Sequence, residues 1–221
     1  MSIIEQFLGI IAPHHCLGCG GEGAVLCAGC AGRLPAIPPR CYRCNVSAHG
    51  YRTCAACSPA SPLFAVMAAT PYADLAKEVI HRLKFERAQA VAADVAAVLA
   101  SGIVLDDITC ITYVPTAPGR IRSRGYDQAA LMAKAISRRT GLPCYALLAR
   151  KGSQRQVGQG RIARHQQMQD AFYARNAGMA RGKHILLIDD VLTTGATCEA
   201  AARVLLQSGA RRVSAAVFAA A

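Results

Sequence analysis

The stretch from His184 to Thr197 constrains the fold of this chain more than any other segment, because it has the pattern of a strand, a loop and a helix in that order. The apolar residues 185–188 predict a buried parallel strand. Two adjacent carboxylates follow it, and then a short loop with hydroxyl groups leads into a helix-forming stretch. The N-terminus of such a helix carries partial positive charge and unpaired N–H donors, which suit a phosphate group. The predicted phosphate-binding residues are Thr193, Thr194, Gly195, Ala196 and Thr197.

The two carboxylates, Asp189 and Asp190, would repel the oxygens of a phosphate bound beside them. Their position makes sense if they face sugar hydroxyls, or a metal ion that bridges to a second phosphate group. A ribose 5-phosphate that carries more phosphate at its other end meets both demands. An ordinary strand-to-helix turn with capping Thr and Asp side chains is the alternative. The functional interpretation is favoured over this alternative, because so many particular residue types at fixed positions rarely coincide by chance.

Cysteine spacing marks a separate region near the start of the chain. Eight of the eleven cysteines form four C-x-x-C pairs, which are Cys16/Cys19, Cys27/Cys30, Cys41/Cys44 and Cys54/Cys57. Two such pairs complete a tetrahedral four-cysteine zinc site, so the pattern predicts one or two structural Zn²⁺ ions. We expect the first two pairs to bind one ion and the last two pairs to bind the other. An interleaved cross-brace is the competing arrangement. So small a segment lacks a sufficient core, and the metal should supply its folding energy.

Composition and charge narrow the class of protein. The chain has 221 residues, 53% apolar and 17% charged, which predicts a globular protein. No apolar run is long enough to span a membrane. Residues 3–11 have no basic residues in front of them, so we expect no signal peptide and predict a cytoplasmic location. Residues 3–11 are typical of a short amphipathic helix. Of the net charge of +12, the segment 120–164 supplies +10, from eleven Lys or Arg and one acid. Such an excess favours a phosphate-rich partner, including nucleic acid.

A Ser/Pro-rich joint at 58–62 predicts two domains. They are a cysteine-rich zinc-ribbon domain with a short N-terminal helix at 1–60 and a main domain at 61–221. The predicted strands are Phe64–Ala69, Cys110–Val114, Cys144–Leu148, Ile185–Ile188 and Val213–Phe218. The predicted helices are Leu75–Leu83, Val91–Leu99, Leu131–Arg139 and the stretch after Thr197. This alternation predicts an α/β fold with a parallel sheet flanked by helices and a ligand site at the carboxyl ends of the strands.

Two further segments carry candidate phosphate-binding groups. The loop 113–120 ends a predicted strand, contains two prolines and a glycine, and leads into the basic residues Arg120, Arg122 and Arg124. It can present N–H groups and guanidinium groups to a pyrophosphate. The polar, basic and glycine-rich segment 150–161 is either a mobile lid over a charged ligand or an ordinary surface loop.

The run from Asp189 to Thr197 resembles the signature of the type I phosphoribosyltransferases, and nearly the whole chain resembles the ComF family, the competence-protein F group of phosphoribosyltransferase-like proteins. The motifs that carry the second resemblance are the cysteine-rich start, Arg82–Phe85, Val114-Pro115, Arg124–Gln128, Gln156, Arg164, Ala171-Phe172 and the signature run. Asp127 and Gln167 stand where the family usually has Asn.

The resemblance implies a role for each matched segment. Asp189 and Asp190 would be the catalytic pair and hold the ribose hydroxyls of phosphoribosyl pyrophosphate, while residues 193–197 would hold its 5-phosphate. Thr116 and Ala117 would hold the pyrophosphate together with Mg²⁺. Further expectations are phosphate binding by Arg124 and a flexible loop at Arg150–Arg161.

Two functions of different class follow from this resemblance. The first is a protein that binds phosphoribosyl pyrophosphate and single-stranded DNA and assists the handling of internalised DNA in natural transformation, with DNA-uptake proteins as partners. The alternative is a phosphoribosyltransferase that acts on an unidentified small-molecule acceptor by displacing pyrophosphate at the anomeric carbon.

Overall fold

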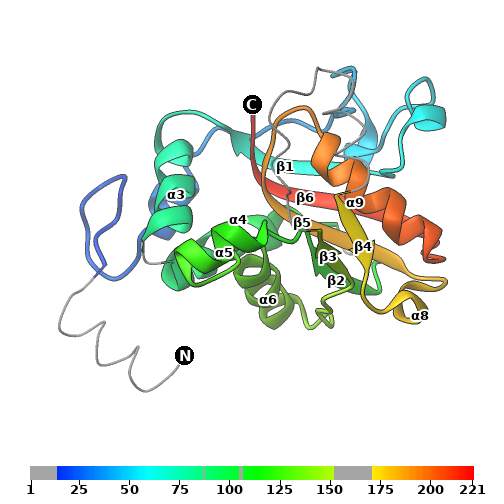
Figure 1. The fold of residues 1–221 in the computed structure, drawn as a ribbon. Coiled ribbons are helices and arrows are strands. Elements are labelled where there is room, and N and C mark those ends of the chain that lie inside the picture. Colours follow the sequence, from blue (N-terminus) through cyan, green and yellow to red (C-terminus); the bar gives the residue numbers. More distant parts are fainter. Residues whose placement is uncertain (1–13, 87, 105–106, 152–170) are drawn as a thin grey trace, which may run out of the picture.

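A four-stranded parallel sheet forms the centre of the computed structural model, which describes residues 14–86, 88–104, 107–151 and 171–221. The strands lie in the order β1 (Val66–Pro71), β6 (Arg212–Ala220), β5 (His184–Leu192) and β2 (Cys110–Tyr113) (Figure 1). Nearly every residue of β5 and β6 is buried, as expected for parallel strands covered on both faces. The predicted parallel α/β fold is therefore confirmed.

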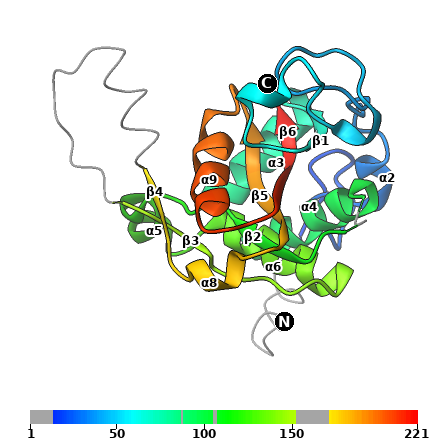
Figure 2. The ribbon, with the colours of Figure 1, turned by 90° about the vertical axis from the view of Figure 1, so that its right-hand side faces the viewer.

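Helices cover both faces of the sheet (Figures 1 and 2). The helices α3 (Asp74–Phe85), α4 (Ala88–Gly102) and α6 (Gln128–Thr140) pack on one face, and α9 (Ala196–Gln207) packs on the other. Alternate residues of β5 belong to the two cores, because successive side chains of a strand point to opposite faces. Leu186 and Ile188 join the core of α3, α4 and α6, whereas Ile185 and Leu187 join the core of α9.

The remaining described elements are short. They are the helices α2 (Ala28–Ala31), α5 (Pro118–Arg124) and α8 (Ala177–Ala180), the 3₁₀ turns η1 (His49–Tyr51) and η2 (Ser58–Ala60), and the strands β3 (Leu148–Arg150) and β4 (Phe172–Ala174). No helix among the described residues has the length and apolar character needed to cross a bilayer. Residues 3–11, expected to form a helix, lie outside the described part.

The predicted strand Cys144–Leu148 is wrong. Cys144 forms only an isolated parallel bridge with Ile111 at the edge of the sheet. The chain then turns, with the N–H of Leu147 donating to the carbonyl of Tyr145, and a strand begins at Leu148 in a separate antiparallel pair of β3 and β4. The apolar pattern marks burial in both arrangements, so it does not distinguish a sheet strand from this turn.

The strand predicted at Ile185–Ile188 is longer than expected. β5 continues through the two aspartates to Leu192, because β6 keeps pairing beside it, with Val191 opposite Ala219. The acid pair therefore lies on regular strand backbone and not in the following loop. This placement fixes the two side chains on opposite faces of the sheet.

The first cysteine pairs pack directly on the main sheet domain. Cys16, Val25 and Cys30 belong to the same buried core as α3 and α4. Asp94 on α4 adds a polar anchor, because its Oδ2 accepts hydrogen bonds of 2.9 Å from the N–H groups of both Val25 and Leu26. Residues 16–30 therefore share a hydrophobic core with the helices.

A buried polar link joins the amino ends of β5 and β6. His184 lies between Asp107 Oδ1, 2.6 Å from its Nδ1, and Ser214 Oγ, 2.8 Å from its Nε2. The hydrogen bond between Asp107 and His184, with the nearby charges of Arg211 and Arg212, holds the pKa of Asp107 below its ordinary value.

Asp107→Asn is expected to lower the free energy of unfolding at pH 7. A carboxyl whose pKa is depressed in the folded state stabilises the protein above its unfolded-state pKa of about 4 and loses this effect as the pH falls through the folded value. Urea unfolding from pH 7 to pH 3 should show the variant and the parent converging at the acid end. A difference that stays constant with pH would contradict this account of Asp107.

Candidate functional site

The acid pair lies at the carboxyl end of β5, close to the point where β2 ends. Tyr113 pairs with Ile188, and the N–H of Val114 donates to the carbonyl of Ile188, so the loop after β2 begins beside the acid pair. Asp190 is buried, and Asp189 Oδ1 accepts a 2.9 Å hydrogen bond from its N–H. The structure thus brings together the two site segments that the sequence predicts.

Lys84 supplies positive charge to the acid pair. Its Nζ lies 3.0 Å from Asp190 Oδ2, at the end of α3. Sequence analysis quoted Lys84 only as part of a motif and assigned it no role. The signal was a basic residue in the last turn of an amphipathic helix, which ordinarily indicates a favourable interaction with the helix dipole.

The pKa of Asp189 lies well above the ordinary value of an aspartate. Burial, together with the charge of Asp190, raises the pKa of Asp189 to about 8. Its Oδ2 accepts a 3.8 Å hydrogen bond from Cys198 Sγ, whose own pKa is raised by the same burial. The raised pKa favours the protonated form of Asp189, whereas Asp190 has the ammonium group of Lys84 beside it, so the pair can both donate to and accept from ligand hydroxyl groups.

The predicted phosphate loop leads directly into α9. Gly195 is the N-cap of the twelve-residue helix α9 and adopts φ +79°, in the left-handed region that favours glycine. Thr193 and Thr194 are exposed, and Thr194 Oγ1 lies 3.4 Å from the N–H of Ala196. The helix N-terminus and exposed hydroxyl groups form a surface suited to a phosphate group.

The second loop is held in place by side chains of α6 and its cap. Asp127 caps α6, and its two oxygens accept hydrogen bonds from the N–H of Thr116, at 2.9 Å, and from Thr116 Oγ1, at 3.0 Å. Asp127 therefore holds the backbone and the side chain of Thr116 in the second loop. Ala117 is the N-cap of α5.

Gln128 joins the two halves of the site. Its Oε1 accepts from Thr116 Oγ1 at 3.1 Å and from Arg124 Nη1 at 3.2 Å, and its Nε2 donates to Asp190 Oδ2 at 3.4 Å. One buried amide thus connects the second loop, Arg124 and the acid pair. Sequence analysis quoted Gln128 only as a motif position.

Asp127→Asn is expected to lower the free energy of unfolding by about 1 kcal/mol, because asparagine has a single oxygen and cannot accept all the hydrogen bonds that Asp127 accepts. Thermal or urea unfolding measures this change. Unchanged stability, or a gain, would show that the Thr116 contacts contribute nothing.

Basic side chains lie beside the acid pair. Partial burial and the neighbouring charge of Arg120 lower the pKa of Arg150, whereas the nearby Asp189 raises it. Positive charges that act on each other in this way suit a ligand with several negative charges. The rest of the expected flexible loop, residues 152–161, lies outside the described part of the structure.

The cysteines form two clusters of consecutive pairs. The first cluster is Cys16, Cys19, Cys27 and Cys30, and the second cluster is Cys41, Cys44, Cys54 and Cys57. Sulfurs bound tetrahedrally to one Zn²⁺ at about 2.3 Å lie about 3.8 Å apart. The sulfurs of Cys19 and Cys27 are 3.8 Å apart, and those of Cys44 and Cys54 are 3.6 Å apart. Both clusters therefore fit a structural zinc ion.

Local hydrogen bonds prepare the cysteines for a metal. Burial alone would raise the pKa of Cys16 and Cys41, but hydrogen bonds from backbone N–H groups lower both values to about 6. Arg33 Nη2 lies 2.9 Å from Cys30 Sγ, where a guanidinium offsets thiolate charge. The lowered pKa favours the thiolate, which is the form that binds metal.

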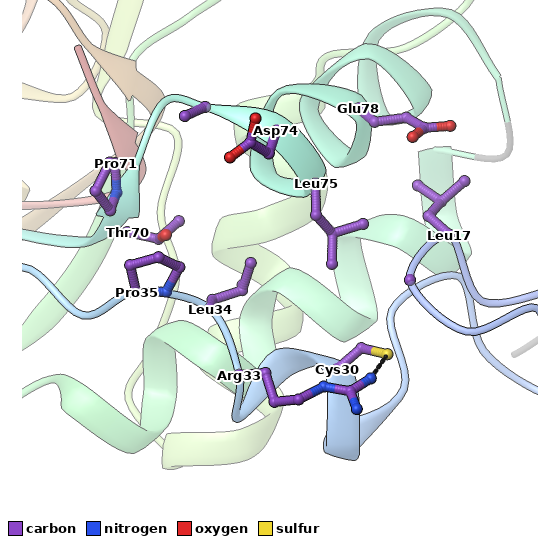
Figure 3. Close-up of a pocket in the computed structure, with 12 residues that line it drawn as sticks. Leu17, Cys30, Arg33, Leu34, Pro35, Thr70, Pro71, Asp74, Leu75 and Glu78 are labelled. Carbon is purple, nitrogen blue, oxygen red and sulfur yellow. Dashed lines mark hydrogen bonds between the residues drawn. The ribbon is translucent and has the colours of Figure 1, made fainter.

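A cavity of about 470 Å³ lies between the first cluster and α3. Figure 3 shows Arg33 beside Cys30 on one side and Asp74, Leu75 and Glu78 of α3 on the other. Neither the acid pair nor the two phosphate-binding loops line it. The candidate ligand site is therefore the surface at the carboxyl ends of β5 and β2, separate from this cavity.

The sequence of this chain is similar to those of several known proteins. Residues 123–221 match the family model of the phosphoribosyl transferase domain. Competence protein ComFC of Bacillus subtilis is 31% identical over 142 residues, which span 62% of this chain and 56% of that protein. DNA utilization protein YhgH of Escherichia coli is 27% identical over 203 residues, which span 85% of this chain and 87% of that protein.

Solved structures with a similar arrangement include the glutamine phosphoribosylpyrophosphate amidotransferase from B. subtilis, at 18% identity and a TM-score of 0.44, covering 58% of this chain and 26% of that one. TT1426 from Thermus thermophilus has 21% identity and a TM-score of 0.34, covering 61% of this chain and 74% of that one.

The parallel sheet and the matched domain define a phosphoribosyltransferase-like protein with a cysteine-rich N-terminal region. Within that class, the chain resembles the ComF family through its similarity to competence protein ComFC and DNA utilization protein YhgH, and its two four-cysteine clusters fit a double zinc ribbon.

Proposed function

We propose that this protein binds phosphoribosyl pyrophosphate with Mg²⁺ and single-stranded DNA, and that it assists the handling of internalised DNA in the cytoplasm during natural transformation. The observation that carries the proposal is the connection made by Gln128, which joins the acid pair to the second loop in one buried network. The names of the two relatives, a competence protein and a DNA utilization protein, support the DNA part of the proposal.

In the proposed complex, the acid pair accepts hydrogen bonds from the ribose hydroxyls, and the start of α9 takes the 5-phosphate. The loop at Thr116 and Ala117 takes the pyrophosphate, with Arg120 and Arg150 as nearby cations. Mg²⁺ would supply charge neutralisation between the pyrophosphate oxygens, and carboxylate chemistry near the loop suits such a hard cation.

Basic side chains beyond this site offer a path for DNA. Five exposed cations lie on α5 and α6, and none of them forms an ion pair within the part of the chain that the structure describes. They are Arg120, Arg122, Lys134, Arg138 and Arg139. Contacts of this kind bind nucleic acid through phosphates, without sequence preference and with strong salt dependence.

The DNA part is tested by fluorescence anisotropy with a labelled single-stranded oligonucleotide at several salt concentrations. Replacing Arg138 and Arg139 with Gln should weaken binding and reduce the salt slope by about two, because each lost phosphate contact reduces it by about one. The matched control replaces Arg203 and Arg211, which form ion pairs on other elements, and should keep the slope. Absence of DNA binding at low salt would overturn this part.

The alternative function is transfer of the phosphoribosyl group to a small-molecule acceptor. The positive charges of Arg120 and Arg150, which act on each other and on Asp189, support it, since such charges would stabilise a pyrophosphate leaving group. Release of pyrophosphate from phosphoribosyl pyrophosphate in the presence of candidate acceptors would support turnover. Tight binding without release, across acceptors of several classes, supports the proposed binding role.

A further inference from the structure

The segment that carries the second cluster contacts the predicted phosphate loop and the first turn of α9. Its first C-x-x-C turn contains Tyr42 and Arg43 between Cys41 and Cys44. The Tyr42 ring covers Gly195, because a methyl group at Gly195 would lie 3.0 Å from Tyr42 Cε2. A residue between two cluster cysteines thus packs on the N-cap of α9.

Polar contacts extend this interface to the first turn of α9. The Tyr42 hydroxyl donates a 2.7 Å hydrogen bond to Glu199 Oε1 and shares a 2.6 Å hydrogen bond with Ser61 Oγ. Arg43 Nη1 lies 3.5 Å from the same Glu199 oxygen, and Arg203 Nη2 lies 2.9 Å from the other. Glu199 is largely buried, with 13% of its side chain exposed.

This arrangement addresses an electrostatic problem. A carboxylate in the first turn of a helix suits the helix dipole but opposes an anion bound at the same N-terminus. The Tyr42 hydroxyl donates to Glu199 and the Arg43 guanidinium lies beside it, so the negative charge of Glu199 is partly offset where it faces the loop.

We infer that Tyr42 is a positioning residue that couples the second cluster to the phosphate loop, so that metal bound by Cys41, Cys44, Cys54 and Cys57 strengthens phosphate binding at residues 193–197. This inference rests on the proposed function for the identity of the ligand. The metal orders the C-x-x-C turn, the turn places Tyr42 and Arg43, and these side chains hold Gly195 and Glu199.

The test uses the full-length protein and ribose 5-phosphate, which probes the phosphate loop without the pyrophosphate. Tyr42→Phe should weaken its binding by about five- to tenfold in calorimetry, as expected for losing one hydrogen bond to a carboxylate. Tyr51→Phe is the matched control, because the Tyr51 hydroxyl donates to the carbonyl of Ile37, within the N-terminal region. It should bind ribose 5-phosphate like the parent.

A second pair of variants separates positioning from general stability. If Tyr42 acts through Glu199, the effect of Tyr42→Phe should fall below twofold in a Glu199→Gln background, where the carboxylate charge is gone. Cys57→Ser should release one zinc equivalent and speed amide hydrogen exchange at residues 193–199, and Tyr42→Phe should speed exchange there with both zinc ions retained.

Two results would overturn the coupling: parent-like affinity of Tyr42→Phe for ribose 5-phosphate, or unchanged exchange at residues 193–199 in both variants. Failure of the parent protein to bind either phosphosugar would instead refute the proposed function. In that case, hydrogen exchange alone decides whether the second cluster orders the loop.

Discussion

Asp189→Asn is expected to stabilise the ligand-free protein at pH 8 by about 1–3 kcal/mol and to weaken binding of phosphoribosyl pyrophosphate by at least about tenfold. Burial and the adjacent charge of Asp190 raise the pKa of Asp189 to about 8. A group whose pKa is raised on folding contributes stability that is full below its unfolded-state value, about 4, and is lost as the pH rises through the folded value. Asparagine removes this loss and keeps the oxygen that accepts from the N–H of Asp190.

The measurement is urea unfolding between pH 4 and pH 8, paired with calorimetry. The parent should lose stability across this range, and the variant should lose less. Opposite signs for stability and binding are typical of a residue kept for a ligand at a cost to the free protein. A variant that is less stable at pH 8, or that binds as the parent does, would contradict this account.

Loss of the first cluster is expected to have the largest effect on stability. Cys16→Ser should remove one of two zinc equivalents and lower the free energy of unfolding by at least about 4 kcal/mol, because metal binding is part of the folding free energy of such modules. Cys16 and Cys30 lie in the core shared with α3 and α4, so the damage should reach the main sheet domain.

Zinc content and urea unfolding check this expectation together. Cys144→Ser is the control, because Cys144 is a half-buried cysteine outside both clusters. It should keep two zinc equivalents. Retention of both metal ions by Cys16→Ser, or unchanged stability after metal loss, would show that the first cluster is not a structural metal site.

Local patterns predicted most of the fold and located the segments of the candidate site. The strand, loop and helix around Asp189 are encoded within about twenty residues, so apolar periodicity and the glycine at the helix start were enough to locate them. Cysteine spacing likewise favoured the consecutive grouping, because each cluster closes over a short stretch of chain.

Long-range contacts could not be predicted in the same way. Lys84 and Gln128 both reach Asp190 from helices far away in the sequence, and nothing in their local patterns names that partner. In the sequence, Tyr42 is only one of two residues between a pair of cysteines, and its contact with Gly195 depends on the fold. The wrong strand at Cys144–Leu148 has the same cause, since its pairing depends on where the sheet edge ends.

The most direct test of the account is calorimetric titration of the full-length protein with phosphoribosyl pyrophosphate and Mg²⁺, in parallel with an Asp189→Asn, Asp190→Asn double variant. We expect saturable binding of one ligand per chain by the parent and an affinity at least about 100-fold weaker in the double variant, which loses both carboxyl groups that contact the ribose hydroxyls in the proposed complex. Equal binding by the two proteins, or no binding by the parent, would contradict the central claim.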